Sequence, residues 1–204
     1  MAHAQLSILD ARQAGRGLSA LSVVLPELIA EARQRAEEFE QRRSLAPDFA
    51  DRLKRAGLFR FLLPAETGGL GGSLGQWLDT LIALAEADAS TAWVCGHGAT
   101  CSALIHALAE PGLRDAFFAD PNACAAWSNL PRVEVTERTD GLRISGSWGF
   151  ATCATLATHV GGMVQLPPRQ DGSPRAAVAL VPVEKARIRE SWDPVGLAGT
   201  GSHD

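Results

Sequence analysis

Hydroxyl side chains beside large aromatic rings mark the part of the sequence with the clearest capacity for chemistry. They occur in CAAWSNLP, residues 124–131, and in SGSWGFATCATLATHVGG, residues 145–162. The aromatic residues are Trp127, Trp148 and Phe150, and the hydroxyl residues include Ser128, Thr152 and Thr155. Aromatic rings supply apolar area, while hydroxyls and backbone N–H groups satisfy the polar edge of a flat heterocycle. The pattern indicates a wall for such a ring, and an ordinary β core is the alternative.

Two other motifs carry less chemistry. GGLGG at residues 68–72 precedes a helix, but it neither follows a strand nor forms a dinucleotide or phosphate-loop pattern, so we interpret it as a turn. Ser202, His203 and Asp204 are consecutive, and neighbouring residues cannot converge on one nucleophile as a hydrolase triad requires. Neither a phosphate loop nor a serine hydrolase is predicted.

No metal site is predicted. His97 and His106 lie on different helix faces without an HExxH pattern, so each is expected to be a hydrogen-bonded helical histidine. No two cysteines form a CxxC pair, which favours buried free thiols and a reducing cytoplasm. The cysteines are Cys95, Cys101, Cys124 and Cys153.

Composition excludes several classes of partner. The chain has 204 residues, a formal net charge of −4 and 46% hydrophobic residues. That balance gives no general attraction to nucleic acid or to anionic membranes. The N-terminus has no secretory signal, and the uncharged stretches 89–109 and 144–168 are too polar or too rich in glycine to span a bilayer. We therefore expect a cytoplasmic protein.

The first part of the chain has helical periodicity. Apolar residues recur every three or four positions from Leu18, with charged residues between them. Pro47 and Gly57 suit the start and the end of a second helix, and Ser73 with Gln76 forms a capping-box pattern. Helices are expected over residues 18–43, 47–57, 73–85, 90–109 and 111–118.

After Pro121 the periodicity changes to short runs between turn signals. Thr139-Asp140-Gly141 joins two alternating runs as in a β-hairpin. Strands are expected within residues 124–130, 132–138, 141–152, 158–166 and 175–183. The sequence thus predicts an α+β protein, with a helical domain over residues 1–120 and a β domain over residues 121–204.

Four segments together resemble a known family. They are AGLFRFLLPAETGG, DASTAWVCG, ISGSWGFAT and SWDPVGLAGTGSHD. Their order and spacing resemble the acyl-CoA dehydrogenase fold, and within it the flavin-dependent monooxygenases that include two-component hydroxylases and desulfurising enzymes. Members of that family are about twice as long. The resemblance, over residues 20–204, therefore implies N-terminal helices and an incomplete antiparallel β-barrel-like domain, with the C-terminal helical bundle absent.

The resemblance implies a flavin site in the β domain. Phe150, Ala151 and Thr152 match a strand that lies against the isoalloxazine ring, with the hydroxyl near flavin N5. Thr152 is thus the catalytic candidate. Trp127 and Ser128 match the neighbouring strand, which faces the pyrimidine edge of the flavin or the substrate.

The resemblance also implies a substrate side, and here the chain departs from the family pattern. Trp93 and His97 lie on the helix that borders the substrate pocket, although the offset between them differs from that of the usual histidine. Thr152-Cys153 stands where relatives commonly have Ser-Gly. Asn129-Leu130-Pro131-Arg132 follows Ser128 where the dehydrogenases carry an acidic residue and Pro followed by Gly-Ser-Asp, and this difference favours the monooxygenase branch.

The implied activity is that of the oxygenase component of a two-component monooxygenase. Such an enzyme would take reduced FMN or FAD from a separate flavin reductase and use O2 to oxygenate a small organic, aromatic substrate. It would be a homotetramer in the cytoplasm. Since a hydroxyl near N5 slows peroxide loss, Thr152→Ala is expected to uncouple flavin oxidation from product formation. The alternatives are an acyl-CoA dehydrogenase-like oxidoreductase and a truncated, catalytically inactive module.

Overall fold

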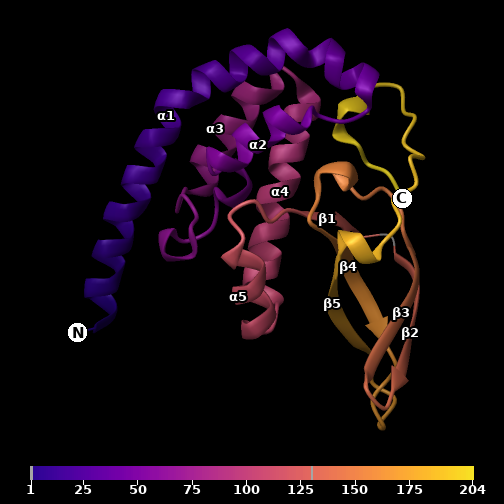
Figure 1. Ribbon diagram of the computed structural model, residues 1–204. Helices are drawn as coiled ribbons and strands as arrows, with labels where there is room; N and C mark the ends of the chain where they lie inside the picture. The colour runs from indigo at the N-terminus through magenta and orange to yellow at the C-terminus, as the bar shows by residue number, and fades with distance from the viewer. Residues whose placement is uncertain (1, 130) are drawn as a thin grey trace.

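The chain folds as a group of helices followed by two small sheets (Figure 1). The structure is a computed structural model that describes residues 2–129 and 131–204. The helices are α1 (Ala2–Arg42), α2 (Pro47–Arg55), α3 (Leu74–Ala85), α4 (Ala89–Leu108) and α5 (Pro111–Ala119). The strands are β1 (Ala125–Ser128), β2 (Pro131–Arg138), β3 (Gly141–Trp148), β4 (His159–Leu166) and β5 (Arg175–Pro182). The predicted order, helices first and strands after, is confirmed.

Local sequence signals set the ends of the short helices. Helix α2 begins at Pro47, and Gly57 just beyond it has a φ of 83°, in the left-handed region that favours glycine. Helix α3 opens with the predicted capping box between Ser73 and Gln76. The Asp88 side chain caps α4 by accepting a hydrogen bond from the backbone N–H of Thr91 at 2.6 Å.

Helix α1 begins well before the expected start at residue 18. Its backbone is helical from Ala2, with Pro26 inside it, and Figure 1 shows it arching over the other helices. Leu28, Ala32 and Phe39 are buried along its later part. Apolar periodicity reveals where a helix packs on a core and not where it begins, so the sequence pattern underestimated its length.

The main core joins the helices to the β region. Phe39 stacks on Phe49 with ring centroids 5.2 Å apart, and Phe61 lies 4.6 Å from Trp77. Cys124, just before β1, and Cys153, between β3 and β4, belong to the same buried cluster. The two parts of the chain therefore share one apolar core, which fixes α4 against the start of β1.

The strands form two small sheets that do not close into a barrel. One has the order β1-β4-β5, with β1 parallel to β4 and β4 antiparallel to β5. The other is the predicted hairpin of β2 and β3, which closes at Arg138 and Gly141. The expectation of an antiparallel, barrel-like domain thus needs correction, because the excursion through β2 and β3 returns the chain parallel to β1.

Candidate active site

The candidate site lies where α4 meets the residues that follow β3. The indole Nε1 of Trp93, on α4, donates a hydrogen bond to Thr152 Oγ1 at 3.2 Å. The rings of Trp93 and Phe150 are 56% and 60% exposed, whereas Thr152 is buried. One exposed aromatic side chain therefore bonds a buried hydroxyl, and a second lies two residues before that hydroxyl in the chain, a combination that suits a flat ring with a polar edge.

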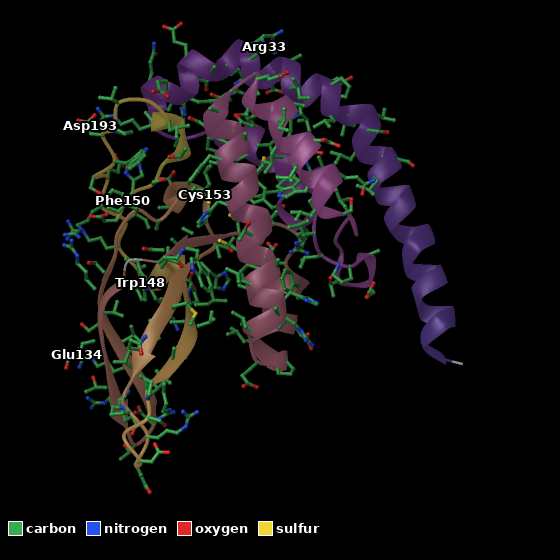
Figure 2. All side chains as sticks on the ribbon, turned by 180° about the vertical axis from the view of Figure 1, so that it is seen from behind. Arg33, Glu134, Trp148, Phe150, Cys153 and Asp193 are labelled. Atoms are coloured by element: carbon green, nitrogen blue, oxygen red, sulfur yellow. The ribbon has the colours of Figure 1, made fainter. Side chains whose placement is uncertain are left out.

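The backbone after β3 turns the Phe150 ring outward. Phe150 has a φ of 57°, in the left-handed region that a bulky residue rarely adopts. The next residue, Ala151, donates its N–H to the carbonyl of His203 at 2.9 Å, and the two form an antiparallel bridge. Trp192 packs edge-to-face on Phe150 with ring centroids 6.0 Å apart. Figure 2 shows Phe150 on the outer side of the β region and Cys153 beside the helices.

A short series of hydroxyls extends from Thr152 into the protein. Thr152 Oγ1 lies 3.0 Å from Ser202 Oγ, which lies 2.9 Å from Thr200 Oγ1. Thr200 Oγ1 then donates to the carbonyl of Leu197 at 2.9 Å. All three hydroxyl residues are buried. Because Ala151 and Cys153 bond the backbone of His203 and Thr200, the C-terminal segment is fixed beside the candidate site.

Ser128 supports the same segment from β1. Its side chain is buried and its hydroxyl donates to the carbonyl of Gly149 at 2.5 Å, just before Phe150. Gly162 of β4 lies opposite Ser128 in the parallel register. Ser128 thus holds the turn that carries Phe150 and Thr152.

Trp127 and His97 contact each other and not Thr152. The backbone N–H of Trp127 donates to His97 Nε2 at 3.2 Å, and the Trp127 indole N–H donates to Asn129 Oδ1 at 2.9 Å. The Trp127 ring is buried in the cluster that contains Ile105. Burial lowers the pKa of His97 to about 4, so its ring is neutral at pH 7 and can accept the Trp127 N–H. The pair joins α4 to β1.

Ala151 contributes its backbone rather than its side chain. The methyl group is buried in a cluster with Ala126, Ala154 and Val160. The Ala151 backbone N–H donates to the His203 carbonyl, which fixes the segment between Phe150 and Thr152.

Two thiols lie behind Thr152. Cys153 Sγ is 3.6 Å from Cys124 Sγ, and both residues are buried. The hydrogen bond to Cys124 and burial together raise the pKa of Cys153 well above its ordinary value. All four cysteines are free and buried, as predicted, so these thiols fill core volume. Within residues 2–129 and 131–204 no group of three or more His, Cys, Asp or Glu is arranged to hold a metal ion.

Three residues of the site escaped the sequence analysis. Thr200 and Ser202 complete the hydroxyl series, and Trp192 covers the edge of Phe150. The signal for Thr200 and Ser202 was the segment GTGSHD, in which each hydroxyl residue follows a glycine. A search for a catalytic triad misses this series, because it consists of hydroxyls alone and Thr152 lies 50 positions from Ser202.

Comparison with known proteins identifies the relationship. Residues 26–120 match the family described as "Acyl-CoA dehydrogenase, N-terminal domain". The chain is 34% identical to indole-3-acetate monooxygenase from Acinetobacter baumannii, over 90% of this chain and 47% of that protein. It is 33% identical to the oxygenase component of the FADH2-dependent resorcinol hydroxylase from Rhizobium sp., over 83% of this chain and 42% of that protein. The chain has the acyl-CoA dehydrogenase-like fold and is similar to flavin-dependent monooxygenases.

A solved structure supports this relationship. The HsaA monooxygenase from M. tuberculosis superposes with a TM-score of 0.80 and 27% identity, over 92% of this chain and 48% of that one. The chain thus spans about half the length of the relatives it matches. Among the described residues of the chain, no helix combines the length and the apolar character that a membrane span requires.

Proposed function

We propose that this chain supplies the flavin-facing wall of the oxygenase component of a two-component monooxygenase. The observation that supports it is the hydrogen bond of the exposed Trp93 to the buried Thr152 hydroxyl, two residues after the exposed Phe150. The enzyme would use reduced FMN or FAD, supplied by a separate reductase, and O2. Its cytoplasmic location and homotetrameric assembly belong to the same proposal, as does the division into a helical domain (1–120) and a β domain (121–204).

The residues present fit a flavin. The Phe150 ring and the Trp93 ring offer apolar surface to the isoalloxazine, and the Thr152 hydroxyl would lie at its N5 edge. Ser128 and Ala151 would hold the segment that carries these groups, through the Gly149 carbonyl and the His203 carbonyl. When bound, the reduced flavin supplies the activation of O2, which no amino-acid side chain provides.

The substrate would lie on the helix side of the flavin. Trp93 has an exposed ring for contact with an aromatic molecule, the kind of compound that indole-3-acetate and resorcinol represent in the names of the two relatives. His97 is half-buried, and its Nε2 accepts the Trp127 N–H. We therefore assign Trp93 to substrate contact, and His97 to positioning β1 behind the pocket.

Anaerobic binding of reduced flavin tests the proposal. The chain should bind reduced FMN or FAD saturably at one site per chain, detected by quenching of tryptophan fluorescence. Phe150→Ala should weaken binding about 10-fold, which corresponds to the loss of about 1.4 kcal/mol of contact. Leu142→Ala, which removes an exposed apolar side chain from β3, is the matched control and should leave the affinity unchanged.

Other outcomes would contradict the proposal. Failure to bind either reduced flavin would favour the inactive module. Binding of oxidised flavin, followed by its bleaching with an acyl-CoA thioester under anaerobic conditions, would favour a dehydrogenase. Equal loss of affinity in Phe150→Ala and Leu142→Ala would place the flavin elsewhere.

A further inference from the structure

The hydroxyl series at the candidate site has a direction that its two ends determine. At the end of the series away from Trp93, the Leu197 carbonyl accepts Thr200 Oγ1–H at 2.9 Å and the Trp192 indole N–H at 3.3 Å. A carbonyl has no proton to give. Leu197 has a φ of 56°, and the turn that follows also brings the Thr200 backbone N–H to the same oxygen, at 3.2 Å.

Each hydroxyl has one proton, so the direction passes along the series. Because Thr200 gives its proton to Leu197, the 2.9 Å contact with Ser202 requires Ser202 to donate. Because the Ser202 proton is then engaged, the 3.0 Å contact with Thr152 requires Thr152 to donate to Ser202. Trp93 Nε1–H can only donate, and it does so to Thr152.

The Thr152 hydroxyl therefore faces the candidate site as an acceptor. Its proton is directed inward to Ser202, one lone pair is taken by Trp93, and one lone pair is left. Reduced flavin carries a hydrogen on N5 and can donate to that lone pair. Oxidised flavin has an unprotonated N5 that can only accept. Its lone pair would face the lone pair of Thr152 Oγ1, and no hydrogen bond would form.

We infer that Trp93, Ser202 and Thr200 are positioning residues that orient the Thr152 hydroxyl as an acceptor, and so make the site prefer reduced flavin to oxidised flavin. This inference rests on the proposed function, because it needs flavin N5 at Thr152. It adds residues from α4 and from the C-terminal segment to the determinants of cofactor selectivity, and neither Ser202 nor Thr200 needs to touch the flavin. Because a mispaired buried hydrogen-bonding group weakens binding, the site should bind reduced flavin about 5- to 100-fold more tightly than oxidised flavin.

The test compares dissociation constants for oxidised and reduced FMN under anaerobic conditions. In the unmodified chain, reduced FMN should bind more tightly. Ser202→Ala removes the acceptor of the Thr152 proton and frees it to turn toward N5, so the ratio of the two constants should fall at least 5-fold. Thr200→Val leaves Ser202 free to donate to Thr152 and should lower the ratio in the same direction, which keeps the test available if one variant folds poorly.

Ser44→Ala is the matched control. Ser44 is also a buried serine bonded to a threonine hydroxyl, Thr155 Oγ1 at 3.0 Å, but it lies outside the series. The redox ratio of this variant should equal that of the unmodified chain. A ratio that stays unchanged in Ser202→Ala and Thr200→Val, or that falls equally in Ser44→Ala, would overturn the inference.

A measurement without flavin separates this inference from the proposed function. In a 15N-labelled chain, Thr152→Val should move the Trp93 indole N–H resonance upfield, because that proton loses its acceptor. Ser202→Ala should leave that proton bonded and its resonance downfield. Failure of both redox forms to bind, with these shifts present, would reject the proposed function and leave the hydroxyl series intact. Absence of the Thr152→Val shift would reject the series itself.

Discussion

The indole N–H of Trp93 meets the hydroxyl of Thr152 at 3.2 Å, across 59 positions of sequence. This bond joins α4 to the segment after β3 at the place where the aromatic side chains are most exposed. It links the two parts of the chain through a group that is also proposed to face the cofactor. The stability of the fold and the geometry of the site therefore depend on the same contact.

Thr152→Val should destabilise the chain more than Thr152→Ser. Valine has a similar volume, but it leaves the Trp93 indole N–H without its acceptor and removes the hydrogen bond between Thr152 and Ser202. The free energy of unfolding should fall by about 1–3 kcal/mol in the valine variant, and by less in the serine variant, which keeps a hydroxyl. Urea unfolding followed by circular dichroism measures both. Equal stability of the two variants would show that the Trp93 bond adds nothing to folding.

His97 should make the fold sensitive to acid. Burial lowers its pKa from 6.5 to about 4, so between those values the unfolded chain binds a proton that the folded chain does not. The stabilisation is complete above pH 6.5 and is lost as the pH falls toward 4, by about 3 kcal/mol. Urea unfolding across this pH range measures the loss.

His97→Gln is the matched variant for this pH dependence. The glutamine amide oxygen can still accept the Trp127 backbone N–H, but glutamine does not titrate. The variant should lose most of the acid-dependent slope. A shallower slope should persist, because burial also lowers the pKa values of His159 and His203. An unaltered slope in His97→Gln would place the acid sensitivity elsewhere.

Gly162 should tolerate no side chain. A Cβ atom there would lie 2.1 Å from the backbone oxygen of Ser128, its partner in the parallel pairing of β1 and β4. Gly162→Ala should therefore cost about 3 kcal/mol and loosen the strand that holds the Phe150 turn. Gly112→Ala in α5, where nothing lies within 4 Å, is the control and should be neutral or stabilising by up to about 1 kcal/mol. Thermal unfolding of both variants decides the comparison.

Arg60 should be needed for the connection from α5 to β1. Its side chain is buried, donates to the carbonyls of Phe118 and Asp120, and lies over the Phe118 ring at 5.2 Å. Arg60→Met should remove both hydrogen bonds and the ring contact, and lower the free energy of unfolding by about 2–3 kcal/mol. Arg175→Met removes an arginine whose ion pair with Glu137 is exposed, and it should change stability by less than about 1 kcal/mol.

Much of the fold could be predicted from local chemistry. Pro47, Ser73 with Gln76 and the turn at Asp140 each predicted a helix start or a hairpin that the structure confirms. These signals depend on neighbours in sequence, so they can be read without the fold. The parallel pairing of β1 with β4 could not be read in this way, because it joins strands separated by a hairpin.

The candidate site could be predicted only in part, because some of its residues are distant in sequence and are brought together by the fold. The pattern around Phe150 and Thr152 indicated a polar, aromatic wall, and the structure brings Trp93 to it. Ser202 and Thr200 reach Thr152 through a backbone bridge between Ala151 and His203. Trp127 has the residue type of a ring-binding aromatic, yet its ring is buried against α4 and α5. Alternation along β1 sends it and Ser128 to opposite faces.

The response of the tryptophan indole N–H resonances to reduced FMN tests most directly whether the flavin binds beside Trp93 and Thr152. An anaerobic titration of the 15N-labelled chain should shift the resonance of Trp93, which is exposed beside Thr152. It should leave the resonance of the buried Trp127 in place. A saturating titration that moves Trp127 while Trp93 stays unchanged would contradict the account.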